Sequence, residues 1–371
     1  MTPLTIAAAG ACTPIGTRAW QTGSAVASRF AAFTRQPIKG HIDHQATVSR
    51  VQAIAPDCTG VDRLVRLAAP ALHEALQGPT TASTAAWPLV RPIPVFIALP
   101  EPLPELRGLI DAQRFALELP RALDVAPEFL PLMLYTGGSV GGADALAAAY
   151  RFLHEHPAVP EVVFGGVDSL VDPAVVDCLY ERRWLKVNGH TEGFIASEGA
   201  AFVRLARKPC AANYVTVFPP GFGQEAAPRV GSEAILGGAG LIDAAIQALK
   251  AATLPAEALH SYWSDTDGSP WRGSELTNLS AALAAQHGHP AMQEPAAFLG
   301  EMGAAWAPLL LCLLHEMRQD LHHPHMPVAL SGHAGLQSVT GLSTRTAAWV
   351  ATWNHTHAPM PSPSTRNREA A

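Results

Sequence analysis

The chain has 371 residues, of which 48% are hydrophobic and 15% are charged, so it can bury a large core. Its 25 Lys and Arg residues are outnumbered by 31 Asp and Glu residues, and the net charge of −6 argues against nucleic acid or an anionic membrane as a partner. No apolar run approaches the roughly 18 residues of a membrane span. The chain opens without a basic leader region and its five cysteines are scattered, so we expect a cytoplasmic protein.

Strand-like and helix-like segments alternate along the first half, with a polar segment over 35–60 that we expect to be surface connection. The expected elements are a strand over 4–10, a helix from 17, a helix over 61–76, a strand over 93–99, a helix over 106–117, a strand over 132–135, a helix over 143–153, a strand over 161–166, a helix over 173–180 and a strand over 200–205.

The second half repeats this rhythm. The expected elements are a strand over 214–218, a helix over 239–251, a strand end over 260–263, helices over 275–286 and 303–317, and strands over 327–330 and 346–353. The alternation favours an α/β fold with a mostly parallel sheet covered on both faces. We expect an N-terminal half over 1–205, a similar C-terminal half over 206–356 and a flexible tail over 357–371.

The most informative segment is 131–153, where an apolar run, a glycine-dense turn and a helix-like stretch follow one another. Ser139 lies at the turn. A side chain at a sharp strand-to-helix corner is pushed out of the sheet, and the first N–H groups of the helix point toward whatever binds there. This position suits a nucleophile, and Gly137, Gly141 and Gly142 would allow tight packing and unusual φ angles.

These segments resemble the β-ketoacyl synthases of the thiolase-like superfamily over nearly the whole chain. In the family the catalytic Cys of the elbow is followed three residues later by Gly, the position of Gly142 here. The matching segments are Ser139-Val140-Gly141-Gly142 with Ala149, Arg151 and Phe152-Leu153 after it, the strand-turn over 10–16, the AGGAE-like Gly165-Gly166-Val167-Asp168, and the GFVxGEGA-like segment over 193–200. The resemblance implies a thiolase-like α/β fold of two similar βαβαβ halves, with mixed sheets layered between helices.

The catalytic positions of the family are changed in this sequence. Ser139 stands where the family has the cysteine that accepts an acyl group. Segment 263–270 resembles the first histidine motif, with Ser264 or Asp265 in the histidine slot depending on a one-residue gap.

The second histidine motif resembles segment 298–306, where Gly300 or Glu301 replaces the histidine, and the preceding lysine is missing. In the segment that resembles the gate loop, 332–337, His333 stands where the family has Phe. A Ser hydroxyl needs a base to become a nucleophile, and a carboxylate repels the negative charge that an enolate develops. We therefore do not expect decarboxylative condensation.

Two hypotheses remain. In the first, the chain has kept the fold and lost the chemistry, like the chain-length-factor subunits that pair with active synthases. The resemblance then implies a homodimer or a heterodimer with a related synthase, with acyl carrier protein or acyl-CoA as further candidate partners. A weaker resemblance, to degenerate thiolase-like proteins encoded beside secretion machinery, suggests type VI secretion components.

In the second hypothesis, Ser139 is a working acyl nucleophile of an acyltransferase or a thioesterase. Residues 137–141 satisfy the G-x-S-x-G pattern, and the order of Ser139, then Asp265 or Asp267, then His333 is that of the α/β-hydrolases. This chemistry requires His333 within hydrogen-bond reach of Ser139. The candidate catalytic residues are therefore Ser139, His333 and Asp265.

Other polar and reactive side chains favour structural interpretations. His322, His323 and His325 lie in a Pro-punctuated segment without acidic or Cys partners at ligand spacing, so we expect neither a metal nor a cofactor. Glu198, within the glycine-rich segment, is expected to be a buried hydrogen-bond acceptor. The remaining expectations are that Cys12 and Cys312 are buried and that Trp263, Trp271 and Trp306 lie near the cleft.

Overall fold

The computed structural model describes residues 2–78, 89, 91–106, 108–190, 192–211, 213–226, 237–254, 259–317, 334–340 and 344–355. The strands are β1 (Leu4–Cys12), β2 (Phe33–Ile38), β3 (His41–Ser49), β4 (Val95–Leu99), β5 (Leu132–Thr136), β6 (Glu161–Ser169), β7 (Glu198–Ala206), β8 (Asn213–Val217), β9 (Gly221–Gln224), β10 (Leu259–Ser264), β11 (Ala291–Gln293), β12 (Ala334–Thr340) and β13 (Arg345–His355).

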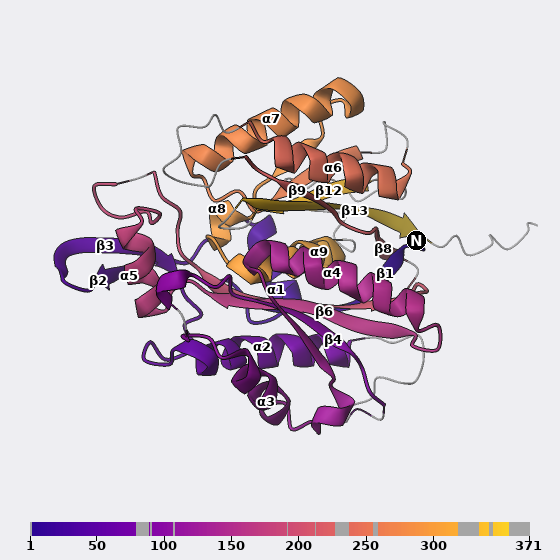
Figure 1. Cartoon of the computed structure of the whole chain (residues 1–371), viewed down its shortest axis with the longest axis horizontal. Helices are drawn as coiled ribbons and strands as arrows, with labels where there is room; N and C mark the ends of the chain where they lie inside the picture. The colour runs from indigo at the N-terminus through magenta and orange to yellow at the C-terminus, as the bar shows by residue number, and fades with distance from the viewer. Residues whose placement is uncertain are drawn as a thin grey trace, which may run out of the picture.

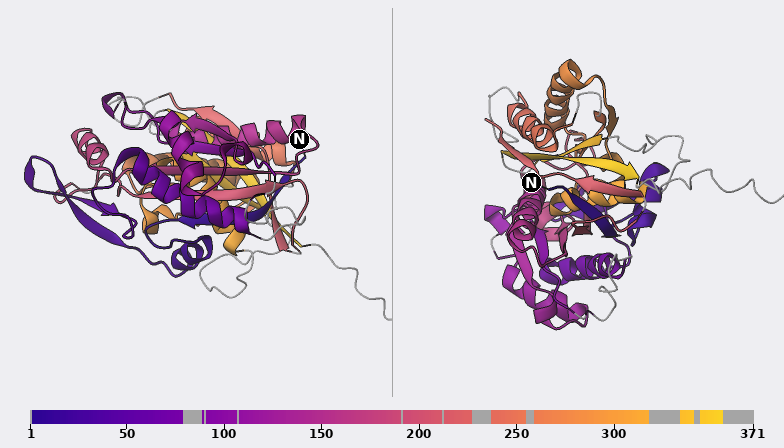
Figure 2. Two further views of the ribbon diagram at one scale, coloured as in Figure 1. Left: turned by 90° about the horizontal axis from the view of Figure 1, so that it is seen from below. Right: turned by 90° about the vertical axis from the view of Figure 1, so that its right-hand side faces the viewer.

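The helices and the sheets alternate in five layers, which Figure 1 and the right-hand view of Figure 2 show edge on. The α-helices are α1 (Ala19–Ala27), α2 (Gly60–Gln77), α3 (Ala112–Ala122), α4 (Gly138–Glu155), α5 (Pro173–Glu181), α6 (Ala239–Ala252), α7 (Pro270–His287), α8 (Ala296–Leu299) and α9 (Trp306–Met317). Helices α2 and α3 cover one outer face, α6 and α7 the other, and α4 and α9 lie between the sheets.

The two halves of the chain have the same strand order. The first half runs β5–β4–β6–β7–β1 and the second runs β11–β10–β12–β13–β8, and β1 pairs with β8 where the halves meet. In each half the first two pairings are parallel and the last two are antiparallel. The mixed sheets implied by the family resemblance are therefore confirmed, whereas the mostly parallel sheet expected from the alternation is wrong.

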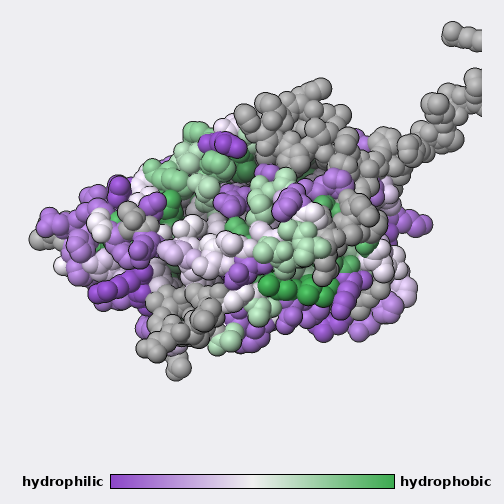
Figure 3. All heavy atoms as spheres, turned by 90° about the horizontal axis from the view of Figure 1, so that it is seen from above, coloured by the Kyte–Doolittle hydropathy of each residue, from purple (hydrophilic) through white to green (hydrophobic). Residues whose placement is uncertain are grey.

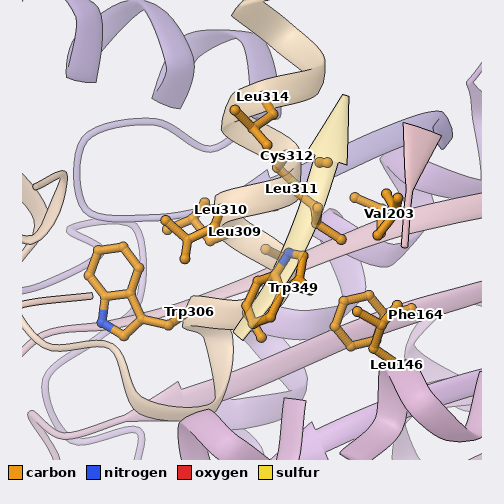
Figure 4. Close-up of a cluster of buried hydrophobic side chains, with 14 of the residues drawn as sticks. Leu146, Phe164, Val203, Trp306, Leu309, Leu310, Leu311, Cys312, Leu314 and Trp349 are labelled. Atoms are coloured by element: carbon orange, nitrogen blue, oxygen red, sulfur yellow. The ribbon is translucent and has the colours of Figure 1, made fainter. Parts of the chain in front are cut away.

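The central helices tie the two sheet layers together through apolar contacts. Figure 4 shows leucines of α9 packed around Trp349, which comes from β13 in the second half, with Phe164 of β6 and Leu146 of α4 beside it. These side chains are fully buried and belong to one continuous cluster. Because α4 and α9 each contact strands of both halves, neither half has a core of its own on this side.

Most expected elements are present, and the exceptions have physical reasons. The expectation of surface connection over 35–60 is wrong in part, because this segment contains most of the β2–β3 hairpin. Many side chains of the hairpin are exposed, which explains why the segment looks polar in the sequence. The helix expected over 106–117 begins at Ala112, because the Asp111 carboxylate caps the N–H groups of Gln113 and Arg114. The segment expected as a gate loop is partly strand, since residues 334–340 form β12.

The strand expected over 327–330 and the tail over 357–371 lie outside the described residues. The boundary between the halves at residues 205 and 206 stays a prediction. In the part of the chain that the structure describes, no helix combines the length and the apolar character needed to cross a membrane.

Candidate functional site

The strand-to-helix corner between β5 and α4 carries Ser139 in the first turn of the helix. Gly137 is the N-cap, and Gly138 has a φ of +56°, a conformation that residues with a Cβ adopt at a cost. A Cβ at position 138 would also lie 2.9 Å from the Cβ of Glu101. The unusual φ angles predicted for Gly137, Gly141 and Gly142 are wrong, because the positive φ of this corner is that of Gly138.

The other glycines of the corner allow the close approach that was predicted. A Cβ at Gly142 would lie 2.5 Å from the Cβ of Ala307, so α4 and α9 could not pack as they do with a larger residue. A Cβ at Gly141 would lie 3.2 Å from the carbonyl oxygen of Tyr135. The corner is thus held against both its own strand and the central helix of the other half.

The hydroxyl of Ser139 donates a hydrogen bond of 3.0 Å to the carbonyl oxygen of Gly303. Ser139 is buried, and Gly303 belongs to the short turn that precedes α9 in the second half. The N–H of Gly303 donates in turn to Oε1 of Glu301. An amide oxygen accepts a hydrogen bond but does not take up a proton at accessible pH, so this contact orients Ser139 without activating it.

Ser139 lines a cavity of about 120 Å³ that lies largely within the first half. Leucines of the segment that follows β4 form its apolar wall, and Gly303 is the contribution of the second half. Its charged lining consists of three carboxylates, those of Glu101, Asp168 and Asp172. We call it the Ser139 cavity.

The carboxyl ends of three neighbouring parallel strands bring these groups together. β5, β4 and β6 lie side by side, Ser139 and Glu101 follow β5 and β4, and Asp168 is near the end of β6. Burial raises the pKa of Asp168 to about 7, although the N–H groups of Ala304 and Ser169 donate to its carboxylate and oppose the shift. The cavity is therefore poorly suited to stabilise developing negative charge.

Asp265 is part of a buried ion pair and is not among the described residues that line the Ser139 cavity. Its Oδ1 lies 2.5 Å from Nη2 of Arg272, and its Oδ2 accepts the N–H of Thr340. Burial raises the pKa of Asp265, and the Arg272 guanidinium opposes the shift. The catalytic role predicted for Asp265 stays a prediction that these contacts do not support.

The remaining positions in the family's histidine slots also make structural contacts. The hydroxyl of Ser264 bonds that of Thr266, and Gly300 has a φ of +79° that favours glycine. The backbone of Glu301 bridges to the segment before β7. His333 lies outside the described residues, so its predicted partnership with Ser139 stays a prediction.

The remaining side chains with structural expectations, one acidic, two cysteines and three tryptophans, are all buried. Glu198 is buried and holds Arg63 with two hydrogen bonds, which confirms it as a structural acceptor. Cys12 and Cys312 are buried as expected, and burial raises the pKa of the Cys12 thiol to about 12. Trp263, Trp271 and Trp306 are buried as well, but none of the three lines the Ser139 cavity.

Sequence analysis did not assign Glu101, Asp168 or Gly303 to the site. Glu101 and Asp168 could have been found, because both lie at the carboxyl ends of strands adjacent to the strand before Ser139. Gly303 could not, because its role is that of a backbone carbonyl 164 residues away in the chain.

The strand order, the central helices and the serine-bearing corner define the thiolase-like fold of the ketosynthases. No protein-family model and no curated protein sequence matches this chain. Solved structures do match it along almost its whole length, as expected from the resemblance of the motifs.

Three of these structures illustrate the similarity. A chain of AntDE:AntF, a type II PKS acyl-carrier protein in complex with its ketosynthase bound to the hexaketide, has a TM-score of 0.70 and 12% identity, with 95% of this chain and 99% of that chain covered. The ishigamide ketosynthase/chain length factor gives 0.66 and 16%, covering 95% and 100%. A β-ketoacyl synthase from Burkholderia phymatum STM815 gives 0.65 and 14%, covering 96% and 100%. At sequence identities of 12%, 16% and 14%, the structural similarity establishes the fold alone.

Proposed function

We propose that this chain is a ketosynthase-like subunit that does not carry out decarboxylative condensation and acts as the structural partner of a related synthase. One observation carries the proposal: the serine at the elbow donates a hydrogen bond to a backbone carbonyl, in a cavity whose described lining contains three carboxyl groups and no basic side chain. Two of the similar solved structures, the ishigamide pair and ApeO with ApeC from Xenorhabdus doucetiae, pair a ketosynthase with a chain length factor.

The chemistry of the cavity supports this assignment. Condensation requires an activated nucleophile and hydrogen-bond donors or positive charge at the enolate oxygen. Ser139 faces an acceptor, and the N–H of Gly303 is already bonded to Glu301. The carboxylates of Glu101 and Asp172 would oppose an enolate electrostatically.

A surface for the partner is available at strand β5. Among the described strands, β5 pairs with β4 alone, so its other edge carries unpaired backbone groups. Four of its five residues, Leu132 to Tyr135, are apolar and half-buried, and the strand contains neither proline nor charge. The opposite end of the sheet, β11, has only three residues and is flanked by Pro290 and Pro295. A matching strand of a related synthase, or of a second copy, would extend the sheet at β5.

The test compares one substitution at each end of the sheet, on β5 and on β11. The tagged protein is recovered from its native source, co-purifying chains are identified by mass spectrometry, and the mass of the complex is measured by light scattering. We expect a thiolase-fold partner with cysteine at its elbow, loss of the complex in Met133→Lys and retention in the control Met292→Lys on β11. A monomer, or a complex unaffected by Met133→Lys, would contradict the proposal.

Acyl carrier protein and acyl-CoA stay within the proposal as ligands of the assembled pair. One similar structure is a complex of an acyl-carrier protein with its ketosynthase. Secretion components gain no support from the comparisons, and we do not include them.

A second candidate function, acyl transfer or thioester hydrolysis by Ser139, is favoured by one feature. Ser139 lies in the first turn of α4 and shares its cavity with Asp168, whose pKa of about 7 is in the range of a general base. In the described part of the chain no hydrogen bond joins these two side chains, and the Ser139 hydroxyl donates to the carbonyl oxygen of Gly303. Formation of a covalent acyl adduct distinguishes this function from the partner role.

A further inference from the structure

We propose that a second hollow, at the end of the molecule formed by the β2–β3 hairpin and α5, binds the phosphate group of a small ligand. The hollow has a volume of about 480 Å³, and we call it the imidazole hollow. It is lined by His41 and His44 of β3, by Tyr180 and Glu181 at the end of α5, by Arg183 just after it, and by five residues of the following turn, Leu185, Val187, Asn188, Gly189 and His190. In Figure 1 the hairpin and α5 lie side by side, and in Figure 3 this end, at the left, is coloured mostly hydrophilic.

The aromatic side chains of the hollow are held in fixed positions. The rings of His41 and His44 stack with their centroids 5.6 Å apart and their planes 10° apart. The ring of Tyr180 packs 4.8 Å from that of His41, and its hydroxyl bonds Nδ1 of His44. When the phenol donates to Nδ1, the proton of His44 lies on Nε2, which is then a donor.

The guanidinium of Arg183 is the cation in the described lining of the hollow. It makes no hydrogen bond or ion pair within the described residues, and Arg183 is exposed. The one carboxylate in the described lining is that of Glu181, whose Oε1 lies 3.9 Å from Nε2 of His41 and whose side chain is 75% exposed. A pair this exposed is weak, so a phosphate can compete with Glu181 for the imidazole.

The carbonyls at the end of α5 and the side-chain amide of Asn188 in the turn are already hydrogen-bonded within the chain. The last carbonyls of α5 already accept N–H groups, that of Tyr180 from Arg183 and that of Leu179 from Trp184. Asn188 shapes the turn by accepting the N–H of Gln45 and donating to the carbonyl of Asp43. The side chain of His190 is therefore the donor that the turn offers to a ligand.

The chemistry favours an anion over a metal. No three His, Cys, Asp or Glu side chains of the described chain are grouped so that they could hold a metal ion. A guanidinium binds a phosphate through two parallel hydrogen bonds, and the N–H groups of the imidazoles add donors. The contrast with the Ser139 cavity is direct, because that cavity is acidic and contacts the other end of the same nine-residue helix, about 14 Å away.

The experiment is calorimetric titration of the full chain with pyrophosphate, inorganic phosphate and acetate. We expect saturable pyrophosphate binding, and a loss of affinity of at least about fivefold in Arg183→Gln and in His190→Gln. Exposed residues elsewhere provide matched controls, Arg121→Gln on α3 and His154→Gln on α4, which should bind as the wild type does.

Three results would overturn the inference: no saturable binding of pyrophosphate, an affinity unchanged in Arg183→Gln, or acetate binding as tightly as pyrophosphate. A nucleoside diphosphate that binds more tightly than pyrophosphate would place the phosphate on an organic ligand, and equal affinities would indicate the free anion. Both results support phosphate recognition. The inference is independent of the partner role, because neither the β5 edge nor Ser139 contributes to the hollow.

Discussion

The corner that follows β5 in the first half and the corner that precedes α9 in the second half occupy equivalent places in the repeated fold. The first presents Ser139 to a cavity, whereas the second, through Gly303, presents a carbonyl that accepts a hydrogen bond from the Ser139 hydroxyl. The Ser139 cavity and the imidazole hollow are both lined almost entirely by the first half. Two halves with one topology can thus differ completely in chemistry, with one forming the site and the other closing it.

The same contrast appears in the buried ion pairs beneath the two corners. In the first half Arg63 meets the single carboxylate of Glu198, which also accepts the N–H of Val51 and the hydroxyl of Ser169. In the second half Asp265, Asp267, Glu275 and Glu301 surround Arg272 and raise its pKa against the effect of burial. In the first pair one guanidinium faces one carboxylate, whereas in the second one guanidinium lies among four acidic side chains.

The largest expected effects come from removing these arginines. Arg63→Met should lower the free energy of unfolding by about 3–5 kcal/mol, because it leaves a buried carboxylate without its partner. Arg272→Met should lower it at least as much at about pH 8, and less at about pH 5, where Asp265 and Glu275 can take up protons. Denaturant unfolding at both pH values measures the two losses.

Both variants should still unfold in one transition, since α4 and α9 contact both sheets. Two separate transitions would show that the halves are independent. An equal loss at both pH values in Arg272→Met would refute the difference between the pairs.

The next effect tests the contact between the corners. Gly303 has a φ of +50°, and a Cβ there would lie 2.1 Å from Oδ2 of Asp168. Gly268 also has positive φ, at +80°, but has open space around it. Gly303→Ala should cost about 3 kcal/mol, and the control Gly268→Ala about 1 kcal/mol, when both are measured by thermal or denaturant unfolding. Similar losses in the two variants would mean that the approach to Asp168 is not tight.

A smaller effect concerns the dependence of stability on pH. The folded chain keeps a proton on Asp168 up to about pH 7, whereas the unfolded chain releases it near its ordinary value of 3.8. The folded state therefore binds more protons between these values, and the contribution of Asp168 to stability falls as the pH rises toward 7.

The stability of the wild type relative to Asp168→Asn should therefore decline between about pH 5 and about pH 8. Glu275, whose pKa burial raises to about 7, provides the matched variant Glu275→Gln in the second half and should show the same sign. Unfolding at several pH values measures both, and a difference from the wild type that does not change with pH would rule out the raised pKa.

Local sequence signals predicted the elbow correctly. The strand, the glycine-rich turn and Ser139 lie within a few residues of one another, so their relation does not depend on the rest of the chain. The resemblance of segment 193–200 and of the elbow to one superfamily was enough to predict the layered fold. The hairpin over 33–49 was missed, because its exposed polar residues hide the strand pattern.

The chemistry of the site depends on contacts that the sequence does not encode locally. Asp265 occupies a catalytic slot in the motif, but a motif cannot show that Arg272 and Thr340 hold its two oxygens. The acceptor for Ser139 is a backbone oxygen, which has no residue type to recognise. The burial that raises the pKa of Asp168 likewise appears only once the layers are assembled.

The reactivity of Ser139 provides the most direct test of the proposed loss of catalysis. The wild type and Ser139→Ala are incubated with a panel of acyl-CoA thioesters and with a fluorophosphonate, and their intact masses are measured. Ser139→Cys treated with iodoacetamide provides the control that reagents reach the cavity. The account predicts no adduct on the wild type while Ser139→Cys is alkylated; an acyl or phosphonyl adduct on the wild type that is lost in Ser139→Ala would contradict it.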